Sequence, residues 1–355
     1  MKESIPMNQK NFILIAGCPR SGTYLLASLL TKHFNIVFPL ETHIFYLLRN
    51  RIHLWGDLKF YENRKHLLTD IYSFLEVWLY KGMKLDKKAL PYSLLSTKKK
   101  SENILRNSTN FESLIHNLYS EYAKNHLAEY YGDKSVPFWH IPLEEIQRLI
   151  PNLKVIHLIR DGRDVHLSWQ KTWFGSSCLY ESARVWAEHL NLKRNWGEKN
   201  PEKYLELKYE DLLSHTDVEI EKISKFLKLN KTTTALTPHF SGIANLYAGK
   251  GHHDLLSGDV VKNNFKKWKK SMDPKDRMFF EYIAGDILNK FKYEVDNKKV
   301  SLADCIRFNL LILFSKFLIF FSINNFKRRI KSILPIILFY ARKFRIVSGK
   351  NKFFR

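Results

Sequence analysis

The chain has 355 residues, of which 45% are hydrophobic and 14% aromatic, and it carries a formal net charge of +23. This composition excludes a disordered chain, and the length is enough to bury a sizeable core. The large positive charge favours an anionic partner such as a nucleic acid, an anionic membrane or an anionic small molecule.

The start of the chain does not have the pattern of a targeting segment. Its first ten residues are polar, and the apolar run that follows is short and ends at Gly17 and Pro19. This pattern does not match a secretory signal peptide. Three widely spaced cysteines also match neither a zinc site nor a disulfide framework, which indicates a reducing compartment. We therefore expect the main body of the chain to stay in the cytoplasm.

The stretch FILIAGCPRSGTYLLASLL, residues 12–30, predicts a strand, a loop and a helix. Residues 11–17 are an apolar run rich in branched side chains that ends at glycine, as in a buried strand. Ser21 and Thr23 are residue types that begin helices. Leucines then recur at helical spacing, at Leu25, Leu26, Leu29 and Leu30.

The loop of this unit has the chemistry of an anion site. The first helical turn exposes unpaired N–H groups, and the helix dipole adds partial positive charge. Gly22 lets the backbone approach a ligand closely, and Arg20 adds a permanently charged fork suited to oxyanions. Hydroxyls come from Ser21, Thr23 and Tyr24. The loop lacks the Gly-Lys-Ser/Thr ending of a nucleotide triphosphatase P-loop, and such a turn can also serve structure alone.

Residues 45–127 predict a helical insertion. The region is rich in leucine, tyrosine and lysine at helical spacings, and it shows no strong strand pattern. These helices are either ordinary core helices or also form one wall of a binding site.

A second informative stretch, residues 142–169, predicts a helix, a strand and another helix. Pro142 begins an apolar-periodic helix that Pro151 ends, and the run KVIHLI then predicts a strand. A further strand is expected within EKYLELKYEDLL, residues 202–213. Strands separated by helices imply a parallel sheet with helices on both faces, and therefore an α/β protein.

Two residues of the second stretch extend the anion site. Arg160 follows the strand directly, and Ser168 lies eight residues further on, about two helical turns away. Both can meet one anionic group at the carboxyl edge of the sheet, where open α/β sheets bind ligands. Anion sites after two different strands indicate a ligand with phosphate at both ends.

Together, GCPRSGTYLL and LIRDGRDVHLSW resemble the two nucleotide-binding motifs of the sulfotransferases that use 3′-phosphoadenosine 5′-phosphosulfate (PAPS). The first resembles the 5′-phosphosulfate loop, G-x-P-R-S-G-T-T-L, and the second resembles the 3′-phosphate motif, R-D-x-R-x-x-x-x-S. The arginine version of the loop is closest to the tyrosylprotein and bacterial carbohydrate branches. The resemblance covers about residues 11–295. It implies a P-loop-like three-layer α/β fold: a central parallel sheet with helices on both faces, a helical insertion and a C-terminal helical tail.

The resemblance implies a sulfotransferase domain over residues 1–300, with PAPS as the donor substrate and no metal. Tyr209 matches a tyrosine near the nucleotide, and Lys267 and Trp268 match a late segment that closes over PAPS. Tyr24 stands where the family loop has threonine, so a backbone N–H contact survives while the hydroxyl moves away from the backbone. The donor-binding residues implied are Arg20, Ser21, Gly22, Thr23, Tyr24, Arg160, Ser168, Tyr209 and Lys267.

The resemblance also implies three catalytic residues. Glu41, in FPLETHIFY, matches a glutamate that acts as general base, and Lys134, in GDKSVPF, matches a lysine that contacts the transferred sulfonate. Arg20, Lys134 and the loop amides would stabilise the charge that builds on the leaving phosphate oxygen during in-line transfer. Glu41 would take the proton of the attacking acceptor hydroxyl. His43 is the alternative base, because the cytosolic branch of the family uses histidine.

Several other residues near these motifs have structural interpretations. Arg163 either shapes the turn after the strand or makes a second anion contact. Trp169, Trp173 and Trp186 recur at helical spacing and are expected in the core. No cluster of aspartate, histidine and cysteine in the sequence has the spacing of a metal site.

The tail, residues 301–355, carries twelve lysines and arginines against one acidic residue, Asp304. Its longest apolar run, residues 308–323, is interrupted by Asn309 and Lys316, and it is shorter than the roughly 20 apolar residues of a spanning helix. Apolar blocks interleaved with basic residues favour a peripheral anchor on an anionic membrane surface, at the inner leaflet. The alternative is a helical pair docked on the main domain.

The sequence thus predicts a PAPS-dependent sulfotransferase that acts on an acceptor hydroxyl. A surface-anchored enzyme of bacterial type suggests a saccharide or lipid-linked saccharide as the acceptor. A kinase-like P-loop enzyme is disfavoured because the loop has Ser-Gly-Thr in place of Gly-Lys-Ser/Thr. A non-catalytic nucleotide- or membrane-binding protein on the same fold is the other alternative. No nucleic acid partner is expected, because the basic excess is densest in an apolar tail.

Overall fold

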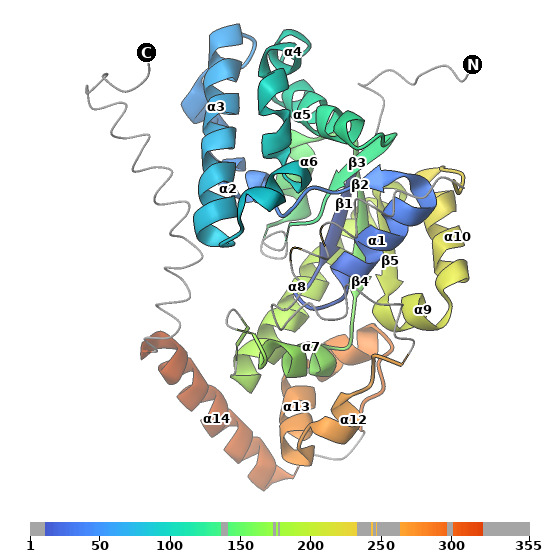
Figure 1. Ribbon diagram of the computed structural model, residues 1–355. Coiled ribbons are helices and arrows are strands. Elements are labelled where there is room, and N and C mark those ends of the chain that lie inside the picture. The colour runs from blue at the N-terminus through green and yellow to red at the C-terminus, as the bar shows by residue number, and fades with distance from the viewer. Residues whose placement is uncertain are drawn as a thin grey trace.

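A computed structural model describes residues 11–135, 141–172, 175–176, 178–232, 243, 246, 263–296 and 301–321 of the chain. Within these residues, five parallel strands form one sheet in the order β2-β3-β1-β4-β5 (Figure 1). The strands are β1 (Phe12–Gly17), β2 (Ile36–Val37), β3 (Tyr130–Asp133), β4 (Leu153–Ile159) and β5 (Tyr204–Lys208).

Helices surround this sheet and extend beyond it. In the described part of the chain the α-helices are α1 (Thr23–Phe34), α2 (Ile44–Leu48), α3 (Tyr61–Val77), α4 (Ser101–Arg106), α5 (Phe111–Asn125), α6 (Leu143–Leu149), α7 (Gly162–Trp169), α8 (Leu179–Lys199), α9 (Tyr209–Ser214), α10 (Thr216–Leu227), α12 (Trp268–Ser271), α13 (Pro274–Lys290) and α14 (Leu302–Phe321). Short helical turns are η2 (Ile52–Trp55), η3 (Trp78–Gly82), η4 (Lys87–Tyr92), η5 (Leu94–Lys100) and η7 (Pro201–Lys203).

The central strand β1 shows why the fold has three layers. On one face, Phe12 and Leu14 pack into a core shared with the helices between β2 and β3. On the other face, Ile13 and Ile15 pack with α1, α9 and α10. A strand that is buried on both faces is apolar at every position, which explains the continuous apolar run in the sequence. The predicted α/β fold with a central parallel sheet and helices on both faces is confirmed.

Two strands of the sheet, β2 and β3, could not be predicted from the sequence. β2 has two residues and β3 has four, so neither is long enough to show a periodic signal. β3 is nevertheless an interior strand, because it pairs with β2 on one side and with β1 on the other, through Ile13 opposite Gly132 and Leu14 opposite Asp133. A Cβ on Gly132 would lie 2.3 Å from the carbonyl oxygen of Ile13, so glycine permits this pairing. The carboxyl ends of β3, β1 and β4 therefore lie side by side.

The segment between β2 and β3 is helical, as the sequence predicts, and forms one outer layer (Figure 1). Its last long helix, α5, begins with a capping box in which Asn110 accepts the N–H of Ser113. Tyr119 and Tyr122, from the inner face of α5, are fully buried against the sheet and the neighbouring helices. The insertion thus contributes a large part of the hydrophobic core.

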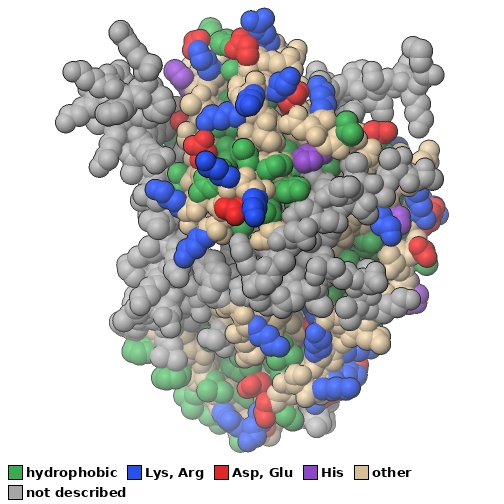
Figure 2. All heavy atoms as spheres, viewed as in Figure 1, with side chains coloured by type: hydrophobic (Ala, Val, Ile, Leu, Met, Phe, Trp, Pro, Cys, Tyr) green, Lys and Arg blue, Asp and Glu red, His purple; other side chains and the backbone are tan. Residues whose placement is uncertain are grey.

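Helix α14 packs on the main body through one face. Phe308 is buried against Phe279 of α13 and belongs to a cluster with Tyr180 of α8. Figure 2 shows hydrophobic side chains at the lower left, where α14 lies in Figure 1. Among the side chains of α14 that the structure describes, the exposed apolar ones are Leu302, Ile306, Leu310, Leu311, Leu313, Phe314 and Phe317. None of the helices in the described ranges has the length and apolar character needed to cross a membrane. The rest of the predicted tail, residues 322–355, lies outside the described residues.

Arg163, near the start of α7, is a buried structural residue. Its guanidinium forms ion pairs with Asp161 at 2.7 Å and with Glu281 of α13 at 2.6 Å. Its Cζ also lies 3.5 Å from the centroid of the Trp268 ring. The alternative of a second anion contact at Arg163 is therefore wrong, because two carboxylates and an aromatic face already surround this fully buried cation. These contacts tie α7 to α13.

Replacing Arg163 by leucine should lower the free energy of unfolding by about 3–5 kcal/mol, because two carboxylates would stay buried without their cation. The matched control is Arg184→Leu, which removes an exposed ion pair with Glu188 on α8. Arg184→Leu should lower the free energy of unfolding by about 1 kcal/mol or less. Urea unfolding followed by circular dichroism measures both effects, and equal losses in the two variants would contradict the structural role of Arg163.

Candidate functional site

The loop between β1 and α1 holds a rare backbone conformation. Arg20 and Gly22 have φ angles of 73° and 92°, both in the left-handed region. Glycine is required at the second position, where a Cβ would lie 2.5 Å from the ring of Tyr209. A non-glycine residue with positive φ is strained, and such strain clusters at functional sites. The first N–H groups of α1 receive no side-chain cap, so they remain suited to an anion.

Ser21 lies between these two left-handed residues and is fully buried. Its backbone N–H donates to the carbonyl oxygen of Cys18 at 3.0 Å. Its Oγ is buried as well and has no hydrogen-bond partner within the described residues. A buried hydroxyl without a partner is unfavourable until a ligand or a water satisfies it. Ser21 is therefore a candidate donor to an anion in this loop.

Arg160, directly after β4, reaches across to the β1 loop. Its Nη1 donates to the carbonyl oxygen of Arg20 at 3.0 Å, and its Nη2 donates to the carbonyl oxygen of Asn264 at 3.0 Å. Its Cζ lies 4.5 Å from the centroid of the Tyr209 ring, and Asp164 lies 3.7 Å away. The buried Nε of Arg160 has no hydrogen-bond partner among the described residues. The guanidinium is thus held in place with one N–H still to be satisfied.

Arg20 connects the two predicted motifs directly. Its Nε donates to Oγ of Ser168 on α7 at 3.0 Å, across 148 residues of sequence. The structure thereby brings Arg20, Arg160 and Ser168 together, as the sequence predicts. Burial lowers the pKa of Arg20, and the nearby positive charge of Arg160 lowers it further. Two partly buried guanidinium groups at one sheet edge create a place where an anion is favourable.

A second cluster, formed by Glu41, Lys134, His43 and Tyr24, lies at the end of β3 and the start of α1. Glu41 Oε1 accepts a hydrogen bond from the Lys134 ammonium at 2.9 Å, and Glu41 Oε2 lies 3.5 Å from His43 Nε2. The Lys134 ammonium also lies 3.2 Å from the centroid of the Tyr24 ring, a cation–π contact. Two of the three residues that the sequence assigns to catalysis, Glu41 and Lys134, are thus in direct contact.

The Glu41–Lys134 pair decides the charge of the carboxylate. Burial by itself would raise the pKa of Glu41, but the charge and hydrogen bond of Lys134 and the nearby His43 ring outweigh it and lower the pKa to about 2. Burial lowers the pKa of Lys134, against the opposing effect of Glu41. Glu41 is therefore ionised at neutral pH and can accept a proton.

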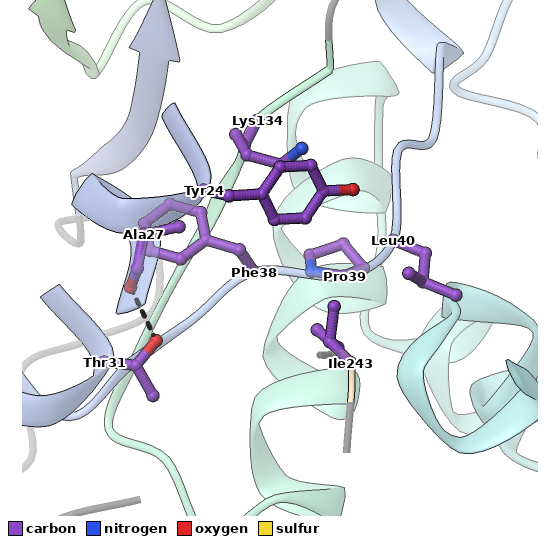
Figure 3. A pocket seen from close by; sticks show the side chains of 8 residues that line it. All are labelled: Tyr24, Ala27, Thr31, Phe38, Pro39, Leu40, Lys134 and Ile243. Atoms are coloured by element: carbon purple, nitrogen blue, oxygen red, sulfur yellow. Dashed lines mark hydrogen bonds between the residues drawn. The ribbon is translucent and has the colours of Figure 1, made fainter. Parts of the chain in front are cut away.

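A small apolar hollow adjoins this cluster. Figure 3 shows the Lys134 side chain lying over the Tyr24 ring, with apolar side chains around them. The lining residues are Tyr24, Ala27, Thr31, Phe38, Pro39, Leu40, Lys134 and Ile243. Tyr24, which stands where the family loop has threonine, thus forms a wall of the hollow and covers the lysine.

The other predicted residues lie around the loop. Thr23 is the first residue of α1, and Tyr209 packs its ring on Gly22. Lys267 is exposed beside the start of α12. Trp268 is buried in the core, as are Trp169 and Trp186, whereas Trp173 lies outside the described residues. Within the described ranges, no group of three or more His, Cys, Asp or Glu side chains could hold a metal ion.

Two contributors to the site were not singled out from the sequence. Asn264 offers its carbonyl to Arg160 and donates its side-chain amide to the hydroxyl of Tyr209 at 3.0 Å. Asp164 accepts the N–H of Trp268 at 2.9 Å and fixes α12 beside α7. Both residues lie inside the motif segments, but spacing alone does not show which partner each one faces.

The fold and the site define an α/β protein of P-loop-like type, with a candidate anion site shared by neighbouring strand ends. The sequence model of the Sulfotransferase family matches residues 13–233, and the chain belongs to this family. No curated protein matched the chain.

Two solved sulfotransferase domains have a fold similar to that of this chain. The sulfotransferase domain from the curacin biosynthetic pathway has 19% identity and a TM-score of 0.53, covering 81% of this chain and 99% of its own. The sulfotransferase domain from the Synechococcus PCC 7002 olefin synthase has 18% identity and a TM-score of 0.52, covering 81% of this chain and 98% of its own. At this identity the likeness establishes the shared fold.

The lowered pKa of Glu41 predicts a pH-dependent contribution to stability. The ion pair stabilises the folded state fully above the ordinary pKa of 4.5, and the contribution is lost as the pH falls toward about 2. Its full size is on the order of 3 kcal/mol. The difference in unfolding free energy between the wild type and Glu41→Gln should therefore narrow by half or more between pH 5 and pH 3. A difference that stays constant over this range, in urea titrations at each pH, would contradict the lowered pKa.

Proposed function

We propose that this protein is a sulfotransferase that moves a sulfonate group from PAPS to an acceptor hydroxyl. One observation carries the proposal: Arg20, Arg160 and Ser168 lie in contact at neighbouring strand ends. Two motifs that resemble the two phosphate sites for PAPS are about 140 residues apart in sequence, and they share one sheet edge in the fold. A single doubly anionic nucleotide fits such a pair of sites.

The donor-binding groups of this proposal include two buried polar atoms without a partner among the described residues, Ser21 Oγ and Arg160 Nε, and backbone N–H groups. Ser21 Oγ, Gly22 and the N-terminus of α1 would hold the 5′-phosphosulfate, and Tyr24 would contribute its backbone N–H. Arg160 and Ser168 would hold the 3′-phosphate. Further contacts to the nucleotide would come from Thr23, Tyr209 and Lys267.

In the proposed transfer, Glu41 removes the proton from the acceptor hydroxyl as its oxygen attacks sulfur. The S–O bond to the phosphate breaks in line, and the electron pair stays on the phosphate oxygen. Lys134 and Arg20 stabilise this developing charge. A pKa of about 2 is low for an efficient base. When PAPS binds, its sulfonate would attract the Lys134 ammonium away from Glu41. The pKa of Glu41 would then rise, because the Lys134 charge is the largest effect that lowers it.

His43 has a supporting role in this proposal. Its Nε2 faces Glu41 at 3.5 Å, and its ring packs on Trp78 with centroids 3.9 Å apart. The imidazole would thus help to orient the carboxylate through Oε2, whereas Lys134 contacts Oε1. Glu41 contacts both groups and is therefore assigned as the base.

The acceptor in this proposal is a hydroxyl of a saccharide or lipid-linked saccharide. Support comes from the mostly apolar lining of the small hollow beside Lys134, which would contact the less polar part of such a molecule at its surface. The tail, residues 301–355, offers a second argument because it combines apolar blocks with an excess of positive charge. An enzyme held at the cytoplasmic face of a membrane would meet lipid-linked acceptors there.

Binding of 3′,5′-bisphosphoadenosine (PAP) and transfer from PAPS test the proposal together. PAP at about 100 times its Kd should stabilise the wild type by about 2.7 kcal/mol, which is several degrees in Tm. Arg160→Ala should lose this shift, because it removes the guanidinium of the 3′-phosphate site. Glu41→Ala should keep the shift but lower the transfer of radiolabelled sulfate by about 10²- to 10⁴-fold.

Transfer is measured into fractionated lipid, polysaccharide and protein from the cells that make this enzyme. ATP with Mg²⁺ is the ligand control and should shift Tm less than PAP does. A larger shift with ATP would favour a kinase-like enzyme. A clear PAP shift without label in any fraction would favour a non-catalytic nucleotide-binding protein. Unchanged turnover in Glu41→Ala would refute its role as base.

The exposed face of α14 predicts binding to anionic membranes. The full-length protein should co-sediment with phosphatidylglycerol vesicles. The double variant Leu310→Glu, Phe314→Glu should bind these vesicles at least about tenfold more weakly, because two apolar side chains are lost from the interface. Leu54→Glu changes a leucine of similar exposure on η2 and is the control for adding a glutamate elsewhere on the surface. Equal sedimentation of all three proteins would reject α14 as the membrane face.

A further inference from the structure

We infer that Asp133 is a positioning residue that fixes the loop carrying Glu41 relative to Lys134. We use the name hydroxyl latch for the carboxylate of Asp133 together with the three hydroxyls around it, from Thr42, Tyr119 and Ser135. The inference rests on the proposed roles of Glu41 and Lys134 in sulfonate transfer.

The latch begins with a fully buried carboxylate at the last residue of β3. Asp133 Oδ2 accepts hydrogen bonds from Thr42 Oγ1 at 2.5 Å and from the hydroxyl of Tyr119. Asp133 Oδ1 accepts a hydrogen bond from Ser135 Oγ at 2.7 Å. Burial raises the pKa of Asp133, and the three hydroxyl hydrogen bonds oppose that effect. Three elements, the loop after β2, the end of β3 and α5, therefore converge on one side chain.

Ser135 extends the latch to the backbone of the loop. Its Oγ accepts the N–H of Thr42 at 2.9 Å and the N–H of His43 at 3.2 Å. His43 has a φ angle of 55°, a left-handed conformation that is strained for a non-glycine residue. On the other side of Glu41, the N–H of Leu40 donates to the carbonyl of Tyr92 at 2.7 Å. The loop around Glu41 is thus fixed by hydrogen bonds on both sides.

The order of residues in the latch links it to the reacting groups. Asp133 and Ser135 flank Lys134, and Thr42 follows Glu41 directly. Each latch contact therefore acts on the immediate backbone neighbour of a proposed catalytic residue. Hydrogen bonds are directional, whereas apolar packing is not, so the latch can define one position of Glu41 against Lys134. The resulting Oε1–Nζ distance is 2.9 Å.

A buried carboxylate is costly unless it is fully hydrogen-bonded, and apolar packing alone would hold β3 in the core. Every oxygen of Asp133 is satisfied by hydroxyls, and all four latch side chains are buried. We therefore interpret the hydrogen bonds of Asp133 as a means of placing the loop accurately, a role that apolar packing alone would not fill. Small errors here matter, because a misplacement of about 1 Å in a reacting group can cost roughly 10²-fold in rate.

The test compares two changes of the same kind at buried threonines. Thr42→Val removes the hydroxyl that donates to Asp133 and keeps the shape of the side chain. Thr97→Val removes a hydroxyl that is paired with the hydroxyl of Tyr72 at 2.9 Å in the same helical insertion. The two variants should lose similar amounts in Tm, because each removes one buried hydroxyl together with its hydrogen bonds.

Only Thr42→Val should change catalysis. Its kcat should fall about 10²-fold with an unchanged KM for PAPS and an unchanged PAP thermal shift. The acid limb of its kcat–pH profile should move to higher pH. Glu41, faced here by Lys134 and His43, loses contact with the cation that lowers its pKa when the loop shifts. Thr42→Ser keeps the hydroxyl and should restore kcat and the pH profile. Rates are measured with the cell fraction that the wild type labels.

The outcomes separate this inference from the proposed function. A wild type that transfers no label from PAPS would overturn the proposed function and the inference with it. An active wild type whose kcat and pH profile are unchanged in Thr42→Val would overturn the inference alone. An equal fall of kcat in the Thr42 and Thr97 variants would also overturn it, since the effect would then follow stability only.

Discussion

The parallel pairing of β1 with β3 on one side and β4 on the other is the constraint on which the site depends. Parallel strands end at the same edge of the sheet, so residues far apart in sequence emerge together. Arg20 follows β1, Lys134 follows β3 and Arg160 follows β4. The backbone ladder thus brings three cations to one edge, and the loops then adjust the distances between their side chains.

The cations of this protein differ in how completely the fold satisfies them. Arg163 lies between two carboxylates at 2.7 and 2.6 Å and serves structure. Arg160 has one carboxylate at 3.7 Å, two backbone carbonyls and a buried Nε without a partner in the described ranges. Lys134 forms an ion pair with Glu41, and the proposed reaction would break this pair when Glu41 takes up a proton. A buried cation whose partners are weak or exchangeable is suited to an anionic ligand, whereas a fully paired one is suited to the core.

The sequence predicted much of the fold, because its strongest signals are local. The apolar run before Gly17 and the run before Arg160 are long enough to identify buried strands, and both are confirmed as β1 and β4. The motifs after these strands carry glycine, hydroxyl and arginine residues in fixed order, which made Arg20, Arg160 and Ser168 recognisable. Their contact follows from the parallel sheet. The roles of these residues in binding PAPS stay predictions.

The sequence by itself determined the α/β class, the family and the residues that meet at the sheet edge. Only the tertiary structure decided what each buried charge faces. β2 and β3 are too short for a periodic signal, so the position of Lys134 beside Glu41 depends on strand pairing. The latch hydrogen bond from Thr42 to Asp133 joins residues 91 apart in the chain, and the Arg163–Glu281 ion pair joins residues 118 apart. Hydrogen bonds and ion pairs between distant residues leave no periodic pattern, since they depend on how the layers pack.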